Sequence, residues 1–303
     1  MASRAYVRVA HHISGFWKPE FTNEPLTTGS LGAGILIDPY LEVYCQSSRT
    51  LNVTITFDSS ALEIPPVTLA LRSHESLREC AVTVRLKLRP GVGYAVSAAA
   101  TLGASVCCAL VGRNPLLSVA LNSSHHAEVV SMTGLGDVAA ISLGHHLPIR
   151  LKSGSPTHAR VDSLLLEPDV RVVTLPLRVY HTREMLSSKK SEFIAYGEEA
   201  LRRFLRNPSL ERFLEEAREF SIRTGLMKPA EALKLESLKA DYSEILGYFV
   251  KKGLLVVFTR KSSAEDIASA LEEEFKTKAH IHAPVWSGII ASHPLPSDLP
   301  HPE

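Results

Sequence analysis

Two acidic residues near the middle of the chain could perform chemistry together. Glu128 and Asp137 stand nine positions apart, and Thr133-Gly134 between them is a turn-forming pair. A turn of this kind can bring two carboxylates to one site, where they suit Mg²⁺ binding and proton transfer. The same residues also fit an exposed glutamate on one helix and an aspartate that caps the next helix. From the residues alone, both interpretations stay open.

A glycine-rich loop precedes a run of small residues. Pro90, Gly91 and Gly93 form the loop, and alanines, Ser97 and apolar residues follow to about Leu110. Glycines let a backbone turn tightly and approach a ligand, and the alanine-rich run predicts a buried helix. The start of a helix favours phosphate, and the Ser97 hydroxyl could reach a phosphate oxygen or Mg²⁺. A buried helix without a ligand is the alternative, because neither common phosphate-binding motif is matched.

A second glycine-containing stretch could hold a small ligand. Three glycines stand among Thr28, Ser30 and an apolar run that ends at Ile37. This pattern suggests a backbone held close to a ligand, with hydroxyl groups aimed into the site. A glycine-bulged strand at a sheet edge is the alternative. The residues before it, 11–19, are polar and aromatic, and we expect them to form a loop.

The elements that must position these residues follow from the apolar patterns. Residues 1–9 alternate like a strand, and the same alternation in 51–57 and 81–88 predicts an antiparallel sheet that leads into the glycine-rich loop. Near residue 168 the pattern changes. Strands are predicted at 170–177, 254–258 and 280–283, and helices from 182, from Asn207-Pro208 as cap and first turn, and from Ser263. The β–α–β ending implies a small α+β domain.

Composition restricts the function classes. The chain has 303 residues, with 45% hydrophobic residues, 21% charged residues and a formal net charge of +1. These values predict two globular domains and give no electrostatic signature of a nucleic-acid or membrane partner. The apolar run 95–112 is rich in alanine, serine and glycine, so a buried helix is preferred to a membrane span.

The four cysteines predict neither a zinc site nor disulfides. Cys45, Cys80, Cys107 and Cys108 show no C-x-x-C spacing, and no signal peptide is apparent at the N-terminus. We therefore expect reduced thiols and a cytoplasmic location. Gln46 is the only glutamine, a bias associated with heat-adapted proteins.

Three motifs carry a resemblance to a known family. The loop resembles the P-x-G-x-G-x-x-x-S-A-A motif of the GHMP kinase superfamily, and residues 91–99 are most similar to those of the archaeal pantoate kinases. The stretch P-L-x-T-G-S-x-G-A-G-I at 25–35 resembles the first motif of that family. H-x-x-E followed by T-G-L-G-D-V-A-A, at 125–140, resembles a further one.

The resemblance implies an α+β fold with the two domains of GHMP kinases. An N-terminal domain of sheet and helices with the phosphate loop would span residues 1–168, and a C-terminal ferredoxin-like domain would span 169–303. The implied activity is ATP-dependent phosphorylation of the primary hydroxyl of pantoate to 4-phosphopantoate in archaeal coenzyme A biosynthesis. The implied cofactors are ATP and Mg²⁺, and pantoate is the small-molecule partner. A homodimer is an open alternative to a single chain.

The resemblance also implies roles for individual residues. Asp137, Glu128 and Ser97 would be catalytic, with Ser97 and Glu128 holding the metal ion. The ATP loop would consist of Pro90, Gly91, Gly93, Tyr94, Ala95, Ser97 and Ala98. The substrate would be held by Ser30, His125 and Arg150. A guanidinium can bind both oxygens of a carboxylate, whereas the alternative for Arg150 is a surface position on an edge strand.

Two departures from the family pattern leave alternatives open. His145-His146 and Pro148 depart from the usual turn before the substrate arginine, so Arg150 is less securely aligned. The third glycine-rich motif of the superfamily is absent, and 224–226 and 240–247 stand near its place. The alternatives are a GHMP kinase for another small alcohol, such as homoserine or mevalonate, and a non-catalytic nucleotide- or metabolite-binding protein on the same fold.

Overall fold

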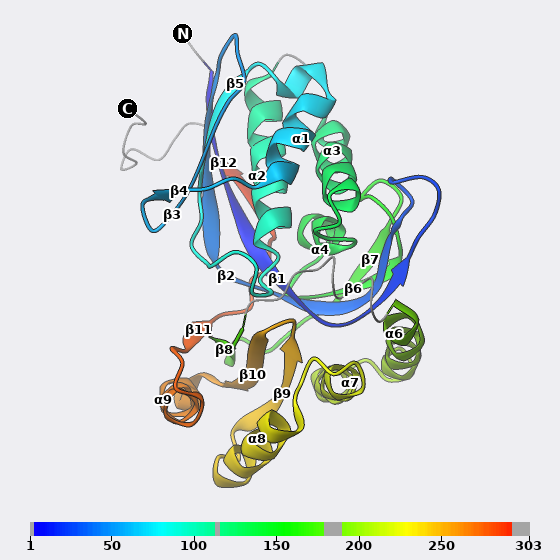
Figure 1. Ribbon diagram of the computed structural model, residues 1–303, viewed down its shortest axis with the longest axis vertical. Coiled ribbons are helices and arrows are strands. Elements are labelled where there is room, and N and C mark those ends of the chain that lie inside the picture. The colour runs from blue at the N-terminus through cyan, green and yellow to red at the C-terminus, as the bar shows by residue number, and fades with distance from the viewer. Residues whose placement is uncertain (1–2, 113–115, 179–189, 293–303) are drawn as a thin grey trace.

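The computed structural model describes residues 3–112, 116–178 and 190–292, which form two β-sheets with helices packed around them (Figure 1). The larger sheet has the strand order β12-β1-β2-β5-β3-β4, and β6 and β7 extend it beside β2. Its strands are β1 (Arg4–Glu20), β2 (Gly29–Ser47), β3 (Asn52–Phe57), β4 (Ser60–Ala61), β5 (Cys80–Arg85), β6 (Leu147–Lys152), β7 (Arg160–Leu164) and β12 (Ile289–Ser292).

Strand β1 is longer than the sequence indicated. The loop predicted at 11–19 is wrong, because β1 continues to Glu20 and pairs antiparallel with β2 as far as Gly29. Irregular pairing between Val9 and His11 and between Ser14 and Phe16 bends the strand. Helices cover this part of β1, so its polar and aromatic residues are buried. The polar residues of this segment therefore suggested a loop, although the helices that pack on the strand bury them.

One strand pair differs from the predicted antiparallel arrangement. Strand β3 runs parallel to β5, while the β2–β5 pair is antiparallel. The connection from β3 to β5 contains α1 (Pro65–Ser73) and a short 3₁₀ helix, Glu75–Leu77. A parallel pair requires a crossover of this kind, and the alternating pattern of a strand does not reveal its direction.

Helix α2 (Val96–Val111) begins at the glycine-rich loop and is almost completely buried, as predicted. It lies against β1, β2 and β5, and α1 and α3 (Leu117–Val130) pack on it (Figure 1). Helix α4 (Asp137–Leu143) follows α3 after a short turn. Of the helices within the described ranges, none is both long and apolar enough to cross a membrane.

The smaller sheet has the antiparallel order β11-β8-β10-β9. Its strands are β8 (Val170–Pro176), β9 (Ile245–Lys251), β10 (Leu254–Arg260) and β11 (His280–His282), and α8 (Pro229–Asp241) and α9 (Ala264–Phe275) accompany it. Helix α7 (Leu210–Arg223) begins later than predicted, because the Ser209 hydroxyl accepts the Arg212 N–H and caps it. The helix predicted from residue 182 starts outside the described residues.

Aromatic packing joins the two parts of the chain. Helix α6 (Lys190–Phe204) and α7 pack against β1. Trp17 stacks on Phe193 at 5.2 Å between ring centroids, and Phe16 contacts Phe204 at 5.7 Å. The chain passes from one sheet to the other between β7 and β8, but β12 returns to pair with β1. The domain boundary at residue 168 stays a prediction.

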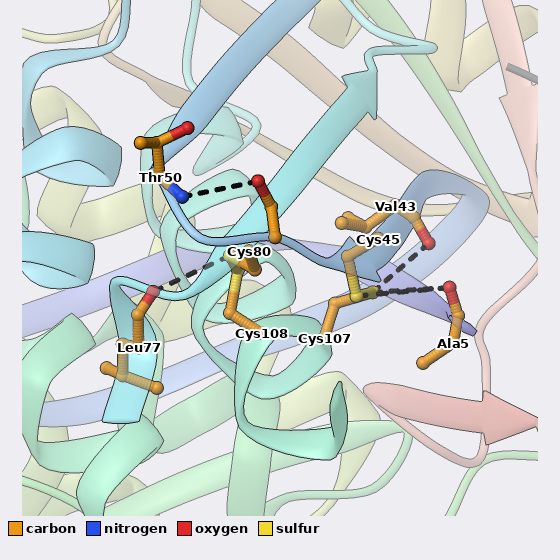
Figure 2. The surroundings of a disulfide bond; sticks show 9 residues. Ala5, Val43, Cys45, Thr50, Leu77, Cys80, Cys107 and Cys108 are labelled. Carbon is orange, nitrogen blue, oxygen red and sulfur yellow. Dashed lines mark hydrogen bonds between the residues drawn. A yellow bond between two sulfur atoms is a disulfide. The ribbon is translucent and has the colours of Figure 1, made fainter. Parts of the chain in front are cut away.

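The cysteines form two disulfides, so the expectation of reduced thiols is wrong. Cys45 of β2 bonds to Cys107, and Cys80 of β5 bonds to the adjacent Cys108 of α2 (Figure 2). The partners are 62 and 28 residues apart. Because β2 and β5 are neighbours and α2 lies on both, two successive cysteines of the helix can reach two strands. Spacing along the chain carries no sign of this arrangement.

Candidate active site

The turn between α3 and α4 brings the two carboxylates together. Glu128 lies in the last turns of α3, and Asp137 is the first residue of α4. A Cβ atom on Gly134 would lie 3.0 Å from Oε2 of Glu128 and 3.1 Å from Oδ2 of Asp137. Glycine therefore leaves the space between the carboxylates open. The alternative of an exposed glutamate is wrong, since Glu128 is only 2% exposed.

Glu128 is tied to the start of α2. Its Oε1 accepts a hydrogen bond from Ser97 Oγ at 2.6 Å, and its Oε2 accepts one from Thr133 Oγ1 at 2.9 Å. Burial raises the pKa of Glu128 to about 7, although these two hydrogen bonds oppose the rise. A hydroxyl and a carboxylate thus meet beside the glycine-rich loop. Oxygen atoms of these two kinds are the ligands that Mg²⁺ prefers.

Asp137 is surrounded by positive and hydrogen-donating groups. Its Oδ1 lies 2.6 Å from Nδ1 of His12 and 3.7 Å from Nζ of Lys251. Burial alone would raise the pKa of Asp137, but Lys251, the His12 hydrogen bond and the charge of Arg150 hold it well below its usual range. Asp137 is therefore ionised at neutral pH. Such a carboxylate can accept a hydrogen bond from a hydroxyl and orient it.

The glycine-rich loop has a left-handed backbone at three positions and buries its larger side chains. Gly91 and Gly93 have φ of 82° and 127°, and Ala95, at the head of α2, has φ of 54°. The Tyr94 side chain points away, because its hydroxyl bonds to Thr174 Oγ1 of β8 at 2.7 Å. Ala98 is also buried. Any nucleotide contact from Tyr94 or Ala98 would therefore involve backbone atoms.

The predicted substrate residues are connected through the segment that contains Thr28 and Ser30. Arg150 is 2% exposed and pairs with both β2 and β7, so it does not lie on an edge strand. Its Nε donates to the carbonyl oxygen of Ser30 at 3.3 Å, which brings these two residues together. His125 contacts the same segment, because its Nε2 donates to the carbonyl of Thr28 at 2.9 Å. This hydrogen bond fixes the backbone just before Ser30.

A cavity lies between the turn that leads to Asp137 and the lysines that end β9. The cavity is lined by Ser14, Trp17, Ser30, Thr133, Gly134, Leu135, Gly136, Asp137, Lys251 and Lys252. Three further residues around the cavity were not among the predicted site residues: His12, Lys251 and Lys252. His12 lay in a segment predicted as a loop. The two adjacent lysines before Gly253 are a visible signal, but a charged pair in a hairpin turn usually faces solvent.

No family model matches the chain, but individual relatives are found. The pantoate kinase of Thermococcus kodakarensis is 30% identical over 287 residues, which cover 90% of this chain and 93% of that protein. The pantoate kinase of Methanocaldococcus jannaschii is 26% identical over 274 residues, covering 86% and 95% of the two chains.

Solved structures share the fold over nearly the whole chain. A phosphotransferase related to the CoA biosynthesis pathway superposes with a TM-score of 0.83 at 23% identity, covering 97% of this chain and 100% of that one. Homoserine kinase from Cytophaga hutchinsonii superposes with a TM-score of 0.68 at 14% identity, covering 95% and 97%. These likenesses confirm the predicted α+β fold.

Proposed function

The chain belongs to the pantoate kinase family, and on this premise we propose that it transfers the γ-phosphoryl group of ATP to the primary hydroxyl of pantoate. The reaction takes place in the cleft formed by the cavity at Asp137 and the adjacent glycine-rich loop. The product is 4-phosphopantoate, an intermediate of coenzyme A biosynthesis. One observation carries the proposal: the open space at Gly134 separates the buried carboxylate of Glu128 from the partly buried carboxylate of Asp137, beside the head of α2. Phosphoryl transfer depends on alignment and on charge neutralisation, for which this arrangement is suited.

Each group at the cleft then has a role. The backbone of the glycine-rich loop and the Ser97 hydroxyl hold the triphosphate. Ser97 and Glu128 are suited to hold Mg²⁺, which when bound neutralises phosphate charge. Asp137 orients the attacking hydroxyl, and Ser30 and Arg150 hold the remainder of the acid, with the guanidinium on the carboxylate. His125 keeps the Ser30 segment in place through Thr28.

The location of the reaction in the cytoplasm follows from the same proposal, because ATP and the precursors of coenzyme A are made there. Disulfides are uncommon in that compartment, but intracellular proteins of hyperthermophiles are an exception. The low glutamine content and the two disulfides both suit an organism of that kind.

The decisive experiment measures ADP release by the purified protein with Mg-ATP and one of four acceptors: pantoate, homoserine, mevalonate or none. We expect release with pantoate alone, together with a phosphomonoester signal in the ³¹P NMR spectrum. Asp137→Asn is the matched control, because it keeps the shape of the side chain and removes its charge. Equal release with all acceptors, or none with pantoate, would leave a nucleotide- or metabolite-binding protein as the better interpretation.

A further inference from the structure

The hairpin turn between β9 and β10 inserts two lysines into the cleft. Lys251 ends β9, and Lys252 with Gly253 forms the turn before Leu254. The turn abuts the glycine-rich loop, since a Cβ on Gly93 would lie 3.0 Å from the carbonyl oxygen of Lys251. Both lysine side chains line the cavity that also contains Ser30 and Asp137. The C-terminal half therefore contributes cations where the glycine-rich loop and the carboxylates meet.

Both lysines interact with Asp137, and Lys252 also interacts with Glu128. Lys251 is buried, with Nζ 3.7 Å from Oδ1 of Asp137. The charge of Lys252 interacts with Asp137 and Glu128, which oppose the lowering of its pKa by burial. His12 and Arg150 are the other positive or titratable groups around Asp137. The space between the carboxylates is thus flanked by positive charge from the smaller sheet.

The backbone of Lys252 has a positive φ, which favours glycine or asparagine over lysine. Its φ is 54°, in the left-handed region. At the first position of a two-residue hairpin turn this region is usually occupied by glycine or asparagine, because a longer side chain is strained there. Strained residues of this kind concentrate at functional sites. A long cationic side chain at this position therefore suggests a role for the cation itself.

The chemistry of the cleft supplies that role. A triphosphate brought next to Glu128 and Asp137 adds negative charge to a site that already holds two acids. In phosphoryl transfer the charge spreads over the three equatorial oxygens of the phosphoryl group, and enzymes neutralise it with cations. The ammonium group of lysine acts on phosphate as a compact point charge.

We propose that Lys251 and Lys252 bind the phosphoryl group as it passes from ATP to the acceptor. This inference rests on the proposed function. The hydroxyl oxygen of the acceptor forms a bond to the γ-phosphorus, and the bond from that phosphorus to the β–γ bridging oxygen breaks. The electron pair of the broken bond stays on ADP. The hydroxyl proton is released to water as the phosphate ester forms, while Asp137 holds the hydroxyl in line with the γ-phosphorus.

The test replaces each lysine by methionine, which keeps the length of the side chain and removes its charge. In Lys252→Met we expect kcat to fall about 100-fold, as when one group that stabilises transition-state charge is removed. Binding gives a second measurement. Calorimetry with Mg²⁺ should show that the affinity for β,γ-imido-ATP falls about tenfold, as for loss of one charge-assisted hydrogen bond, while the affinity for ADP is unchanged.

Lys276→Met is the matched control. Lys276 is exposed at the end of α9 and has a φ of 52°, close to that of Lys252, so the same substitution there should leave kcat unchanged. Lys252→Arg, which keeps the charge, should retain more activity than Lys252→Met. If Lys251→Met does not fold, the Lys252 variants decide the matter.

Two results would overturn the inference: kcat unchanged in Lys252→Met, or an equal loss of affinity for β,γ-imido-ATP and ADP. The proposed function fails separately. In that case the wild-type protein would release no pantoate-dependent ADP, whereas the difference between the two nucleotides in binding would still report on the lysines.

Discussion

His12 donates a hydrogen bond from Nδ1 to Oδ1 of Asp137 across 2.6 Å, although the two residues are 125 positions apart. The other ring nitrogen, Nε2, lies 3.4 Å from Nη1 of Arg150. Because arginine can only donate, Nε2 must accept, and this assigns the proton of the neutral ring to Nδ1. Burial supports the neutral form by lowering the pKa of His12 to about 4. One imidazole thus links the proposed substrate arginine to the proposed catalytic aspartate.

Replacing His12 by alanine should lower kcat about tenfold or more, because Asp137 loses the group that orients it. His12→Asn is the matched variant, since its side-chain amide can still donate to Asp137 from near the position of Nδ1. We expect it to recover part of the loss. Steady-state kinetics with saturating ATP would check both variants. Equal activity of wild type and His12→Ala would contradict an orienting role.

Replacing Arg150 by methionine should raise the KM for pantoate about 100-fold and leave the KM for ATP within a factor of two or so, because a bidentate charge-assisted contact is lost only to the acid. Lysine at this position should not restore binding, since it lacks the planar fork. Thermal unfolding of each variant controls for the loss of a buried side chain. A parallel rise in both KM values would indicate that Arg150 maintains the fold of the cleft instead.

Stability should fall as the pH drops below 6.5, because buried histidines resist protonation. Burial lowers the pKa of His11 to about 3 and that of His282 to about 4. The unfolded chain binds these protons near pH 6.5 and the folded chain does not, so each group disfavours folding by up to about 3 kcal/mol near pH 4. Glu128 acts in the opposite direction, since its pKa is raised when folded.

His11→Phe isolates one of these histidines. Among the described residues, Nε2 of His11 has no hydrogen-bond partner, and phenylalanine would lose only the 3.3 Å bond from Nδ1 to the carbonyl of Tyr94. Urea unfolding at several pH values between 7 and 4 should show a smaller loss of stability in the variant than in the wild type. Parallel curves for the two proteins would contradict the assignment to His11.

Reduction of the disulfides should destabilise the protein without a direct effect on the cleft. Each bond restricts the unfolded chain, and loops of this length correspond to about 3 to 4 kcal/mol each. A reductant should therefore lower the urea midpoint, and the same shift should be absent from a variant with all four cysteines replaced by alanine. Thiol titration of the denatured, unreduced protein gives the direct control. Four reactive thiols there would contradict the two bonds.

Local patterns in the sequence predicted the parts of the site that are themselves local. The glycine-rich loop and the buried helix after it are contiguous, and Glu128 and Asp137 are joined by one short turn. Backbone geometry alone relates such residues to one another. The roles assigned to the site residues stay predictions, but the structure brings Ser97, Glu128 and Asp137 together as the motifs suggested.

Long-range pairing determined what the sequence could not reveal. His12 was expected in a loop and instead lies in β1, where its partners come from α4 and β6. The lysines reach the cleft because the smaller sheet abuts the glycine-rich loop. The disulfides depend on how α2 lies across two strands. Each of these results from contacts between segments far apart in the chain, which neither periodicity nor spacing encodes.

The pairing of β12 with β1 has a consequence for how this protein must be made. Strand β1 is synthesised long before β12, so Tyr6–Val9 obtain their second neighbour only when 289–292 have been made. Until then a nascent chain displays an open strand edge, which is a template for pairing with other chains. Aggregation during translation, rather than marginal stability of the finished enzyme, is the hazard that this topology creates.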